Sequence, residues 1–179
     1  MIYKKRYKTP KDFSNIIMNS NGEYLTGLWF EGSRDSSKHT IDCEEKELEI
    51  FKETERWLDI YFSGTNPDFV LKYKIEKLTP FRKQVIDIMN KIPYGKTITY
   101  NDIAKEIANL KGIERMSAQA VGGAVGWNPI CIIIPCHRVV GTNGSLTGYG
   151  GGIKNKIALL MHEKNDMSKY FAPNRGTAL

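Results

Sequence analysis

Long apolar runs are missing from this sequence. Nowhere in its 179 residues does a run approach the roughly 20 apolar residues that span a bilayer, and the sequence does not open on a charged stretch followed by an apolar one. Cysteine is scarce too, with three residues, an odd number that does not suit a framework of disulfide bonds. We therefore expect a protein of the cytoplasm, where thiols stay reduced, with no membrane partner.

Histidine is as scarce as cysteine, which limits the metal sites that the chain can build. His39 and Cys43 lie four residues apart, but no CxxC pair and no second pair of ligands lies nearby in the sequence. An ordinary surface loop explains these two residues better than a metal site. We expect neither a metal nor a cofactor.

Acidic residues are few in the second part of the chain. Residues 1–78 carry 13 Lys and Arg against 14 Asp and Glu, a net charge of −1, whereas residues 79–179 carry 13 against 6, a net charge of +7. A basic surface is the electrostatic footprint of phosphate binding. Basic surfaces also serve solubility alone, and composition does not decide between the two.

The length allows one large domain or two small ones. A boundary is predicted near residues 77–80, where Thr79 can cap a helix and Pro80 suits its first position. We expect an N-terminal domain over residues 1–78, a C-terminal domain over residues 79–168 and a tail over residues 169–179.

The first 78 residues predict a scaffold in the order strand, strand, helix, strand. Residues 24–30 are apolar and aromatic, and residues 69–75 alternate like a half-exposed strand. Between them, apolar residues recur with a period near 3.5 from Leu48 to Phe62, and Gly64 follows as a helix stop. No group of residues here suggests chemistry.

Three helices are predicted next. The first follows Pro80 and ends at the Pro-Tyr-Gly turn of residues 93–95, Thr99 caps the second, and Ser117 caps the third over residues 118–125. The last two, joined by a short connection that contains glycine, are typical of a helix-turn-helix.

A hairpin predicted at Asn143-Gly144 would add a wing to the helix-turn-helix. In the expected recognition helix, Gly122 and Gly123 leave a slender face that could approach a groove closely. Small residues serve the packing of helices more often, and that alternative stays open.

The sequence Pro135-Cys136-His137-Arg138-Val139 follows the apolar run of residues 130–134, which predicts a buried strand. Because proline cannot continue a central strand, Cys136 is expected at the strand end, in a turn. A thiol attacks only as thiolate, and the neighbouring His137 and Arg138 could favour that form. The alternative is that Cys136 is one more small buried residue.

Glu163 lies on the apolar stripe of the last predicted helix, three residues after Leu160. A carboxylate is costly there unless it is paired. We therefore assign it to the second imidazole nitrogen of His137, as the third member of a Cys-His-Glu relay. A surface glutamate at a frayed helix end is the alternative.

These motifs together resemble the 6-O-alkylguanine-DNA alkyltransferases, also called methylated-DNA–protein-cysteine methyltransferases. The resemblance covers about residues 79–165, and the first 78 residues match only loosely. In family order, the chain carries Thr99-Tyr100, Ala120-Val121-Gly122-Gly123-Ala124, Asn128-Pro129, the Pro-Cys-His-Arg-Val motif, Gly148-Tyr149-Gly150-Gly151-Gly152 and Leu159-Leu160-Met161-His162-Glu163.

The resemblance implies an α/β (α+β) protein with an N-terminal ribonuclease-H-like domain and a helical winged helix-turn-helix alkyltransferase domain. It implies repair by direct reversal of damage, in which an alkyl group passes once and irreversibly from the 6-oxygen of guanine to Cys136. The 4-oxygen of thymine is left open as a second target. The expected partner is double-stranded DNA containing 6-O-alkylguanine, bound through its minor groove by a monomer.

Residue roles follow from the resemblance. Tyr100 would donate to guanine N3 and stabilise the leaving group, and Asn128 would tie the active-site turn together by hydrogen bonds to the backbone. The backbones of Cys136 and Val139 would accept from the exocyclic amine of guanine. The remaining residues expected to contact DNA or substrate are Gln119, Ala120, Gly122, Gly123, Arg138, Tyr149 and Gly150.

Two positions depart from the family pattern. Gln119 stands where the family commonly has an arginine that fills the space of a flipped base, and Gly150 replaces a small hydroxyl residue. Two other functions stay open: a non-catalytic winged-helix DNA-binding regulator, which would not need the Cys-His-Glu set, and a cysteine hydrolase of small molecules, which would leave the basic half unexplained.

Overall fold

The computed structural model describes residues 1–40 and 42–173, which form two compact units. The first comprises Met1–Lys77 with Pro129–Cys131, and the second comprises Leu78–Asn128 and the chain from Ile132 onward. Both units combine helices with strands, which confirms the expected α/β (α+β) class. Within the described ranges, every helix is too short or too polar to cross a membrane.

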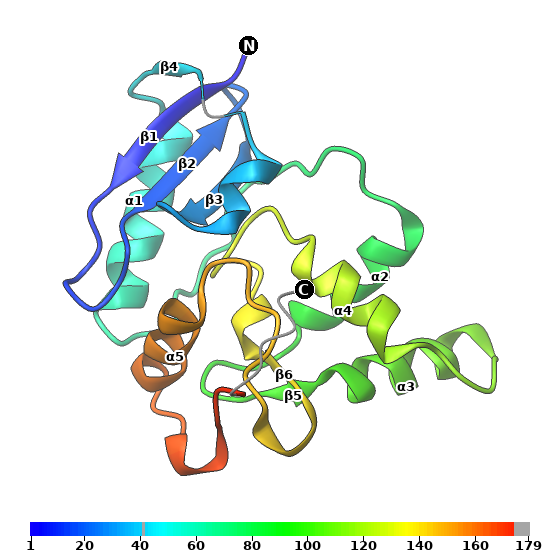
Figure 1. The fold of residues 1–179 in the computed structure, drawn as a ribbon. Coiled ribbons are helices and arrows are strands. Elements are labelled where there is room, and N and C mark those ends of the chain that lie inside the picture. The colour runs from blue at the N-terminus through cyan, green and yellow to red at the C-terminus, as the bar shows by residue number, and fades with distance from the viewer. Residues whose placement is uncertain (41, 174–179) are drawn as a thin grey trace. The chain divides into compact units, whose positions relative to one another are not determined.

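A four-stranded sheet forms the first unit, with β1 (Tyr3–Tyr7), β2 (Ile16–Ser20), β3 (Leu25–Phe30) and β4 (Glu44–Glu45). Its order is β3-β2-β1-β4, and β4 runs parallel to β1 while the other neighbours are antiparallel. The helix α1 (Glu49–Phe62) lies across one face of this sheet (Figure 1).

The core of the first unit lies between α1 and the sheet. Alternate residues of a strand point to the same face, so Ile16 and Met18 of β2 are both fully buried. Phe51 and Leu58 supply the buried face of α1. The helix ends at Phe62, and Gly64 follows as expected, with a positive φ of +93° that glycine adopts at low cost.

The expected order of elements in this unit, with two strands before the helix and one after it, is wrong. All four strands precede α1, and residues 69–75 form no strand beyond a single bridge between Tyr73 and Leu25. The alternating pattern of residues 69–75 reflects the burial of every second side chain alone, since Leu71 is buried whereas Val70 is 90% exposed. An extended segment can bury every second side chain without joining a ladder.

His39 and Cys43, the pair considered as metal ligands, make separate contacts. The His39 ring stacks on Trp29 with 4.1 Å between ring centroids. The Cys43 thiol lies 3.4 Å from the carbonyl oxygen of Thr40.

Helices dominate the second unit. The helices α2 (Pro80–Met89), α3 (Tyr100–Lys111) and α4 (Ala118–Gly126) pack against one another (Figure 1). A two-stranded parallel sheet pairs β5 (Ile98–Thr99) with β6 (Val139–Val140), and α5 (Ile153–His162) follows. Short 3-10 turns are η2 (Cys136–Arg138), η3 (Thr142–Gly144) and η4 (Met167–Lys169).

The three predicted N-caps are confirmed. The side chains of Thr79, Thr99 and Ser117 each accept a backbone N–H from the first turn of α2, α3 and α4. At the other end of α4, the guanidinium of Arg82 lies 4.0 Å from the ring centroid of Trp127. These contacts fix α4 at its start and at its end.

The strand expected over residues 130–134 is wrong. Ile130 makes a single bridge with Leu28, and a turn follows in which Ile132 has a φ of +68°. A positive φ is strained for a β-branched residue, and here the buried side chain of Ile132 holds it in place. The apolar run reflects burial, which does not by itself distinguish a strand from a buried turn.

The expected wing forms only its turn. Asn143 and Gly144 both have positive φ, as in the two-residue turns of hairpins, but no ladder flanks them among the described residues. Of the expected tail, residues 174–179 lie outside the described residues. In place of a hairpin ladder, Phe171 forms a single bridge with Ser145, next to the turn.

Candidate active site

Cys136 lies at the start of η2 and is 5% exposed. The residue before it, Pro135, has φ −81° and ψ 60°, close to the values of an inverse γ-turn, and the Cys136 N–H donates to the Ile134 carbonyl at 2.8 Å. Proline fixes φ near the value that this turn needs. Local sequence therefore sets the sharp turn that presents the thiol.

Asn128 supports the same turn. Its side-chain N–H donates to the Ile134 carbonyl at 2.9 Å, so this oxygen accepts from both Asn128 and Cys136. A carbonyl oxygen has two lone pairs and can accept both hydrogen bonds. Asn128 is itself buried and lies where the sequence predicts it, bonded to the backbone of the active-site turn.

His137 is fully buried, and its Nε2 lies 2.7 Å from Oε1 of Glu163. Burial lowers the pKa of His137 below its ordinary value of 6.5, against the opposing effect of the Glu163 carboxylate. We assign the proton of the neutral ring to Nε2, because the carboxylate accepts there. Nδ1 then has a lone pair, and no protein atom of the described residues hydrogen-bonds to it.

Glu163 directly follows the last residue of α5, and its side chain is fully buried. Its Oε2 accepts from the Gly95 N–H at 3.0 Å and from Nε of Arg138 at 2.9 Å. Burial alone would raise the pKa of Glu163, but the hydrogen bonds from His137 and Arg138, together with the positive charge of Arg138, outweigh it and hold that pKa far below its ordinary range. The expected contact between His137 and Glu163 is present, and the frayed surface end is not.

Arg138 turns inward although it was expected among the residues that bind DNA or substrate. It is 7% exposed, and its Nε and Nη2 form a two-pronged ion pair with Glu163. Its Nη1 donates to the Ile92 carbonyl at 2.8 Å. The geometry makes it an internal partner of the carboxylate.

Tyr100 opens α3, and its hydroxyl donates to the Thr147 carbonyl at 3.2 Å. Burial, with a smaller effect from Cys136, raises the pKa of Tyr100 to about 12. The hydroxyl therefore keeps its proton at neutral pH and can act as a hydrogen-bond donor.

A pocket of about 360 Å³ adjoins Tyr100. Its walls come from α3, from α4 and from the loop that follows β6. Among the residues that line it are Tyr100, Gln119, Gly122, Gly141, Thr142 and Thr147.

The expected recognition helix, α4, presents a nearly bare face. Gln119, Ala120 and Gly123 are exposed, and a side chain built on Gly123 would meet nothing within 4 Å. Gly122 points the other way and is buried. Of the two glycines, Gly123 therefore leaves the outer face of α4 slender. Gly122 instead lies in the packed side of the helix and lines the pocket.

Lys156 is the site residue that the sequence analysis missed. Its side chain is completely buried in α5, and its ammonium donates to the Val139 carbonyl at 2.6 Å. Burial lowers its pKa to about 8, although the charge of Cys136 opposes the shift. Lys156 stands seven residues before Glu163, on the same apolar stripe, so the argument that singled out Glu163 also applies to it.

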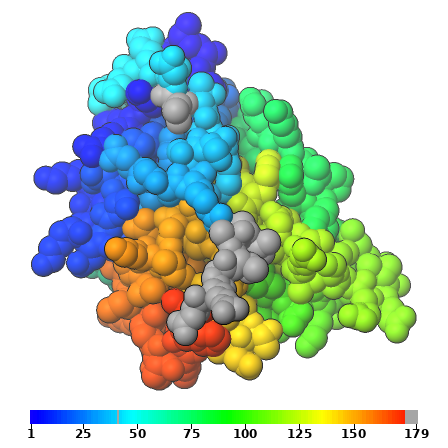
Figure 2. Space-filling model, in the orientation of Figure 1, coloured from blue at the N-terminus to red at the C-terminus, as the bar shows by residue number. Residues whose placement is uncertain are grey.

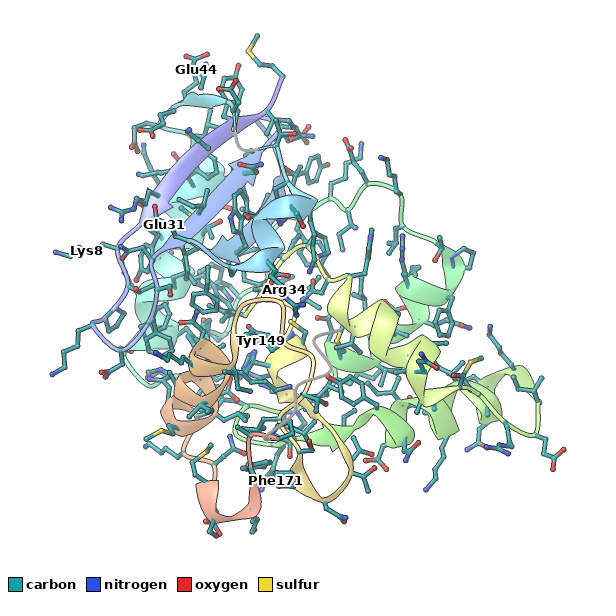
Figure 3. All side chains as sticks on the ribbon, in the orientation of Figure 1. Lys8, Glu31, Arg34, Glu44, Tyr149 and Phe171 are labelled. Carbon is teal, nitrogen blue, oxygen red and sulfur yellow. The ribbon has the colours of Figure 1, made fainter. Side chains whose placement is uncertain are left out.

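The loop before α5 carries the remaining expected residues. Tyr149, labelled in Figure 3, is buried, and its ring centroid lies 5.7 Å from the Lys156 ammonium. Gly150 follows it and is partly exposed. Gly148 and Gly152, on either side, have positive φ, which glycine tolerates.

Known proteins share this fold and this site region. The family model described as "6-O-methylguanine DNA methyltransferase, DNA binding domain" matches residues 80–165. The methylated-DNA–protein-cysteine methyltransferase of Methanosarcina acetivorans is 47% identical over 115 residues, which cover 64% of this chain and 70% of that protein. The protein of the same name from Methanosarcina barkeri is 44% identical over 152 residues, 85% of this chain and 92% of that protein.

A solved structure agrees with these relatives. The crystal structure of Mycobacterium tuberculosis OGT in complex with DNA matches with a TM-score of 0.75 and 33% identity over 94% of each chain. The chain therefore belongs to the 6-O-methylguanine DNA methyltransferase family, as its motifs predict.

Proposed function

We propose that this protein repairs DNA by moving a methyl or larger alkyl group from the 6-oxygen of guanine to the sulfur of Cys136. One observation carries the proposal. The residue after Cys136 is a buried, neutral imidazole whose Nε2 is held by the buried carboxylate of Glu163, while Nδ1 has a lone pair with no protein partner described. An imidazole in that state is a general base beside a nucleophile.

The reaction begins with the thiol proton. It passes to Nδ1 of His137 through one water, and Glu163 stabilises the imidazolium that forms. The bond from sulfur to the alkyl carbon forms as the bond from that carbon to the 6-oxygen breaks. The electron pair leaves with guanine, which takes up a proton from water, and His137 later returns the thiol proton to water. The Tyr100 hydroxyl turns its proton from the Thr147 carbonyl to N3 and so supports the leaving base.

The protein acts once. A thioether is a far poorer leaving group than the guanine anion, so the alkyl group stays on Cys136. The Cys136 and Val139 carbonyls accept from the exocyclic amine of guanine, and amides of the Tyr149-Gly150 loop face the 6-oxygen. Asn128 keeps the turn rigid through its bond to the Ile134 carbonyl.

DNA binds through residues 79–168, which we propose as the alkyltransferase domain, with residues 1–78 as a scaffold. The net charge of +7 on residues 79–179 supports phosphate contacts, and a relative was crystallised with DNA. The bare face of α4, with Ala120 and Gly123, enters the minor groove, and Gln119 meets the space that the extruded base vacates. We further propose that the protein acts as a monomer in the cytoplasm, where its three cysteine thiols stay reduced.

The deciding experiment follows a labelled methyl group. Excess duplex carrying labelled 6-O-methylguanine should transfer one label per chain and then stop, and peptide mapping should find the label on Cys136. Cys136→Ala should abolish transfer and keep DNA binding, while Cys43→Ala and Cys131→Ala are the matched controls that keep transfer. Label on another residue, or continued turnover without a reductant, would overturn the proposal. A duplex with 4-O-methylthymine in the same assay tests the second target.

A non-catalytic regulator is the less favoured alternative. Such a protein would have no use for the buried His137–Glu163 pair beside a cysteine, and the relatives named above are methyltransferases. The regulator predicts tight binding to one duplex sequence. Our proposal predicts binding to many sequences that weakens steadily as salt rises.

A further inference from the structure

The turn at Asn143-Gly144 is hydrogen-bonded through its backbone to Phe171, which lies much later in the chain. The Phe171 N–H donates to the Gly144 carbonyl at 3.1 Å, and the Leu146 N–H donates to the Phe171 carbonyl at 2.8 Å. Phe171, labelled in Figure 3, lies beside this turn, and in Figure 2 the yellow surface of the turn adjoins the red end of the chain. We call residues 166–171 the C-terminal brace.

Side chains of the brace anchor it on the same unit. The Tyr170 hydroxyl lies 2.9 Å from Oγ1 of Thr97 and donates to Oδ1 of Asn165 at 3.4 Å. The apolar parts of Met167 and Tyr170 pack against a small core. That core consists of the buried residues Val140, Leu146 and Leu160.

Gly144 shows that the turn is fitted to the brace. It has a φ of +84°, and a Cβ at this position would collide with the carbonyl oxygen of Lys169. Any other residue would therefore strain the backbone and push the brace away. The glycine meets two demands, one from the turn and one from the brace.

The braced loop is a wall of the pocket next to Tyr100. Gly141, Thr142 and Thr147 line that pocket, and the Thr147 carbonyl accepts from the Tyr100 hydroxyl. The brace contacts the loop between these residues, at Gly144 and Leu146. It lies beyond residues 80–165, the part that the family model matches.

We propose that the C-terminal brace determines specificity by holding this wall of the pocket in place, which limits the size of the alkylated base that the site accepts. The inference rests on the proposed function, since the pocket must receive the extruded base. When the brace is released, the loop moves outward. The rate of transfer from bulky 6-O-benzylguanine then rises relative to the rate from 6-O-methylguanine. Discrimination by the size of a pocket amounts to roughly tenfold or more.

Two variants at position 171 distinguish the effect of the backbone hydrogen bonds of the brace from the effect of the exposed Phe171 side chain. Phe171→Pro deletes the N–H that bonds to Gly144, whereas Phe171→Ala removes a side chain that is 51% exposed and keeps both backbone bonds. The full-length protein is mixed with duplexes carrying either lesion, and single-turnover rate constants are measured. Phe171→Pro should raise the ratio of the benzyl to the methyl rate constant by roughly tenfold, and Phe171→Ala should leave it unchanged.

Amide hydrogen exchange at Leu146 supplies a readout that needs no substrate. Phe171→Pro should speed it by about tenfold or more, because local opening of the loop becomes easier. If Phe171→Pro does not fold, Tyr170→Phe, which removes only the hydroxyl, takes its place with the same expected direction. An unchanged rate ratio in a folded brace variant would overturn the inference while the wild type still transfers label. Loss of transfer in the wild type would instead refute the proposed function.

Discussion

The ammonium of Lys156 donates to the carbonyl oxygen of Val139 across 2.6 Å, inside a region that buries the lysine completely. Burial disfavours the charged form of an amine and therefore lowers the pKa of Lys156, here from 10.5 to about 8. The same Val139 carbonyl is proposed to accept from the exocyclic amine of guanine. Lys156 thus connects α5 to Val139, a residue that our proposal places beside the base.

Lys156 makes the stability of the protein depend on alkaline pH. Between about pH 8 and 10.5 the unfolded lysine still binds its proton while the folded one has lost it, so the unfolding free energy rises with pH across this window. Relative to Lys156→Met, the wild type should gain about 3 kcal/mol, measured by denaturant titration at each pH. Lys154→Met, at an exposed position of the same helix, is the control and should show no such difference. Parallel pH curves for wild type and Lys156→Met would contradict the prediction.

Arg138 should be needed for stability more than for DNA contact. Arg138→Met leaves the Glu163 carboxylate buried without its two-pronged partner, and we expect a loss of about 3–5 kcal/mol at pH 7. Lys83→Met, which breaks the exposed pair with Asp87, should cost under about 1 kcal/mol. Affinity for undamaged duplex should fall little in the folded fraction. A large loss of affinity with unchanged stability would show that Arg138 contacts DNA.

As pH falls, the unfolding free energy of the protein should decline in two steps, because two buried groups bind protons more weakly in the fold than in the unfolded chain. The pKa values of both His137 and Glu163 are lowered in the fold, so in each case the unfolded chain binds the proton first as pH falls. Stability should decline as pH drops below 6.5, the ordinary value for histidine, and more steeply below 4.5, the ordinary value for glutamate. Denaturant midpoints measured from pH 7.5 to 3.5 test this. In Glu163→Gln the second decline should become shallower.

Sequence predicted those features that depend on neighbours in the chain. The caps Thr79, Thr99 and Ser117 are local hydrogen bonds, and all three are present. The contact between Glu163 and His137 followed from the cost of burying an unpaired carboxylate, which holds wherever the partner comes from.

Features that depend on distant partners were not predictable in this way. A guanidinium in a basic region suits phosphate as well as carboxylate, so the inward turn of Arg138 becomes visible only with Glu163 placed beside it. The apolar run of residues 130–134 indicated that this segment is buried, but it did not indicate whether the segment forms a strand or a turn. The turn at Asn143-Gly144 predicted its own conformation, but nothing local indicated that Phe171 would pair with the adjoining backbone.

Glu163→Gln should slow the chemical step more than it weakens DNA binding. The amide still occupies the site beside His137, but it no longer carries the negative charge that stabilises the imidazolium. Single-turnover rates at increasing DNA concentration separate the limiting rate from the half-saturating concentration. We expect the limiting rate to fall by roughly 100-fold, within the range of general-base contributions, and the half-saturating concentration to change little. Equal losses in both would indicate a structural role for Glu163.

We expect Gln119 to limit how well the protein opens duplex DNA. It is exposed near the start of α4, lines the pocket by Tyr100 and carries no charge. Gln119→Arg should speed transfer in duplex DNA severalfold, because a long cation can fill the vacated stack and meet the phosphates. It should do little on single strands, which need no base flipping. Gln119→Met, similar in length but uncharged, separates the effect of charge from that of size. If Gln119→Arg accelerates both substrates equally, position 119 does not take the place of the extruded base.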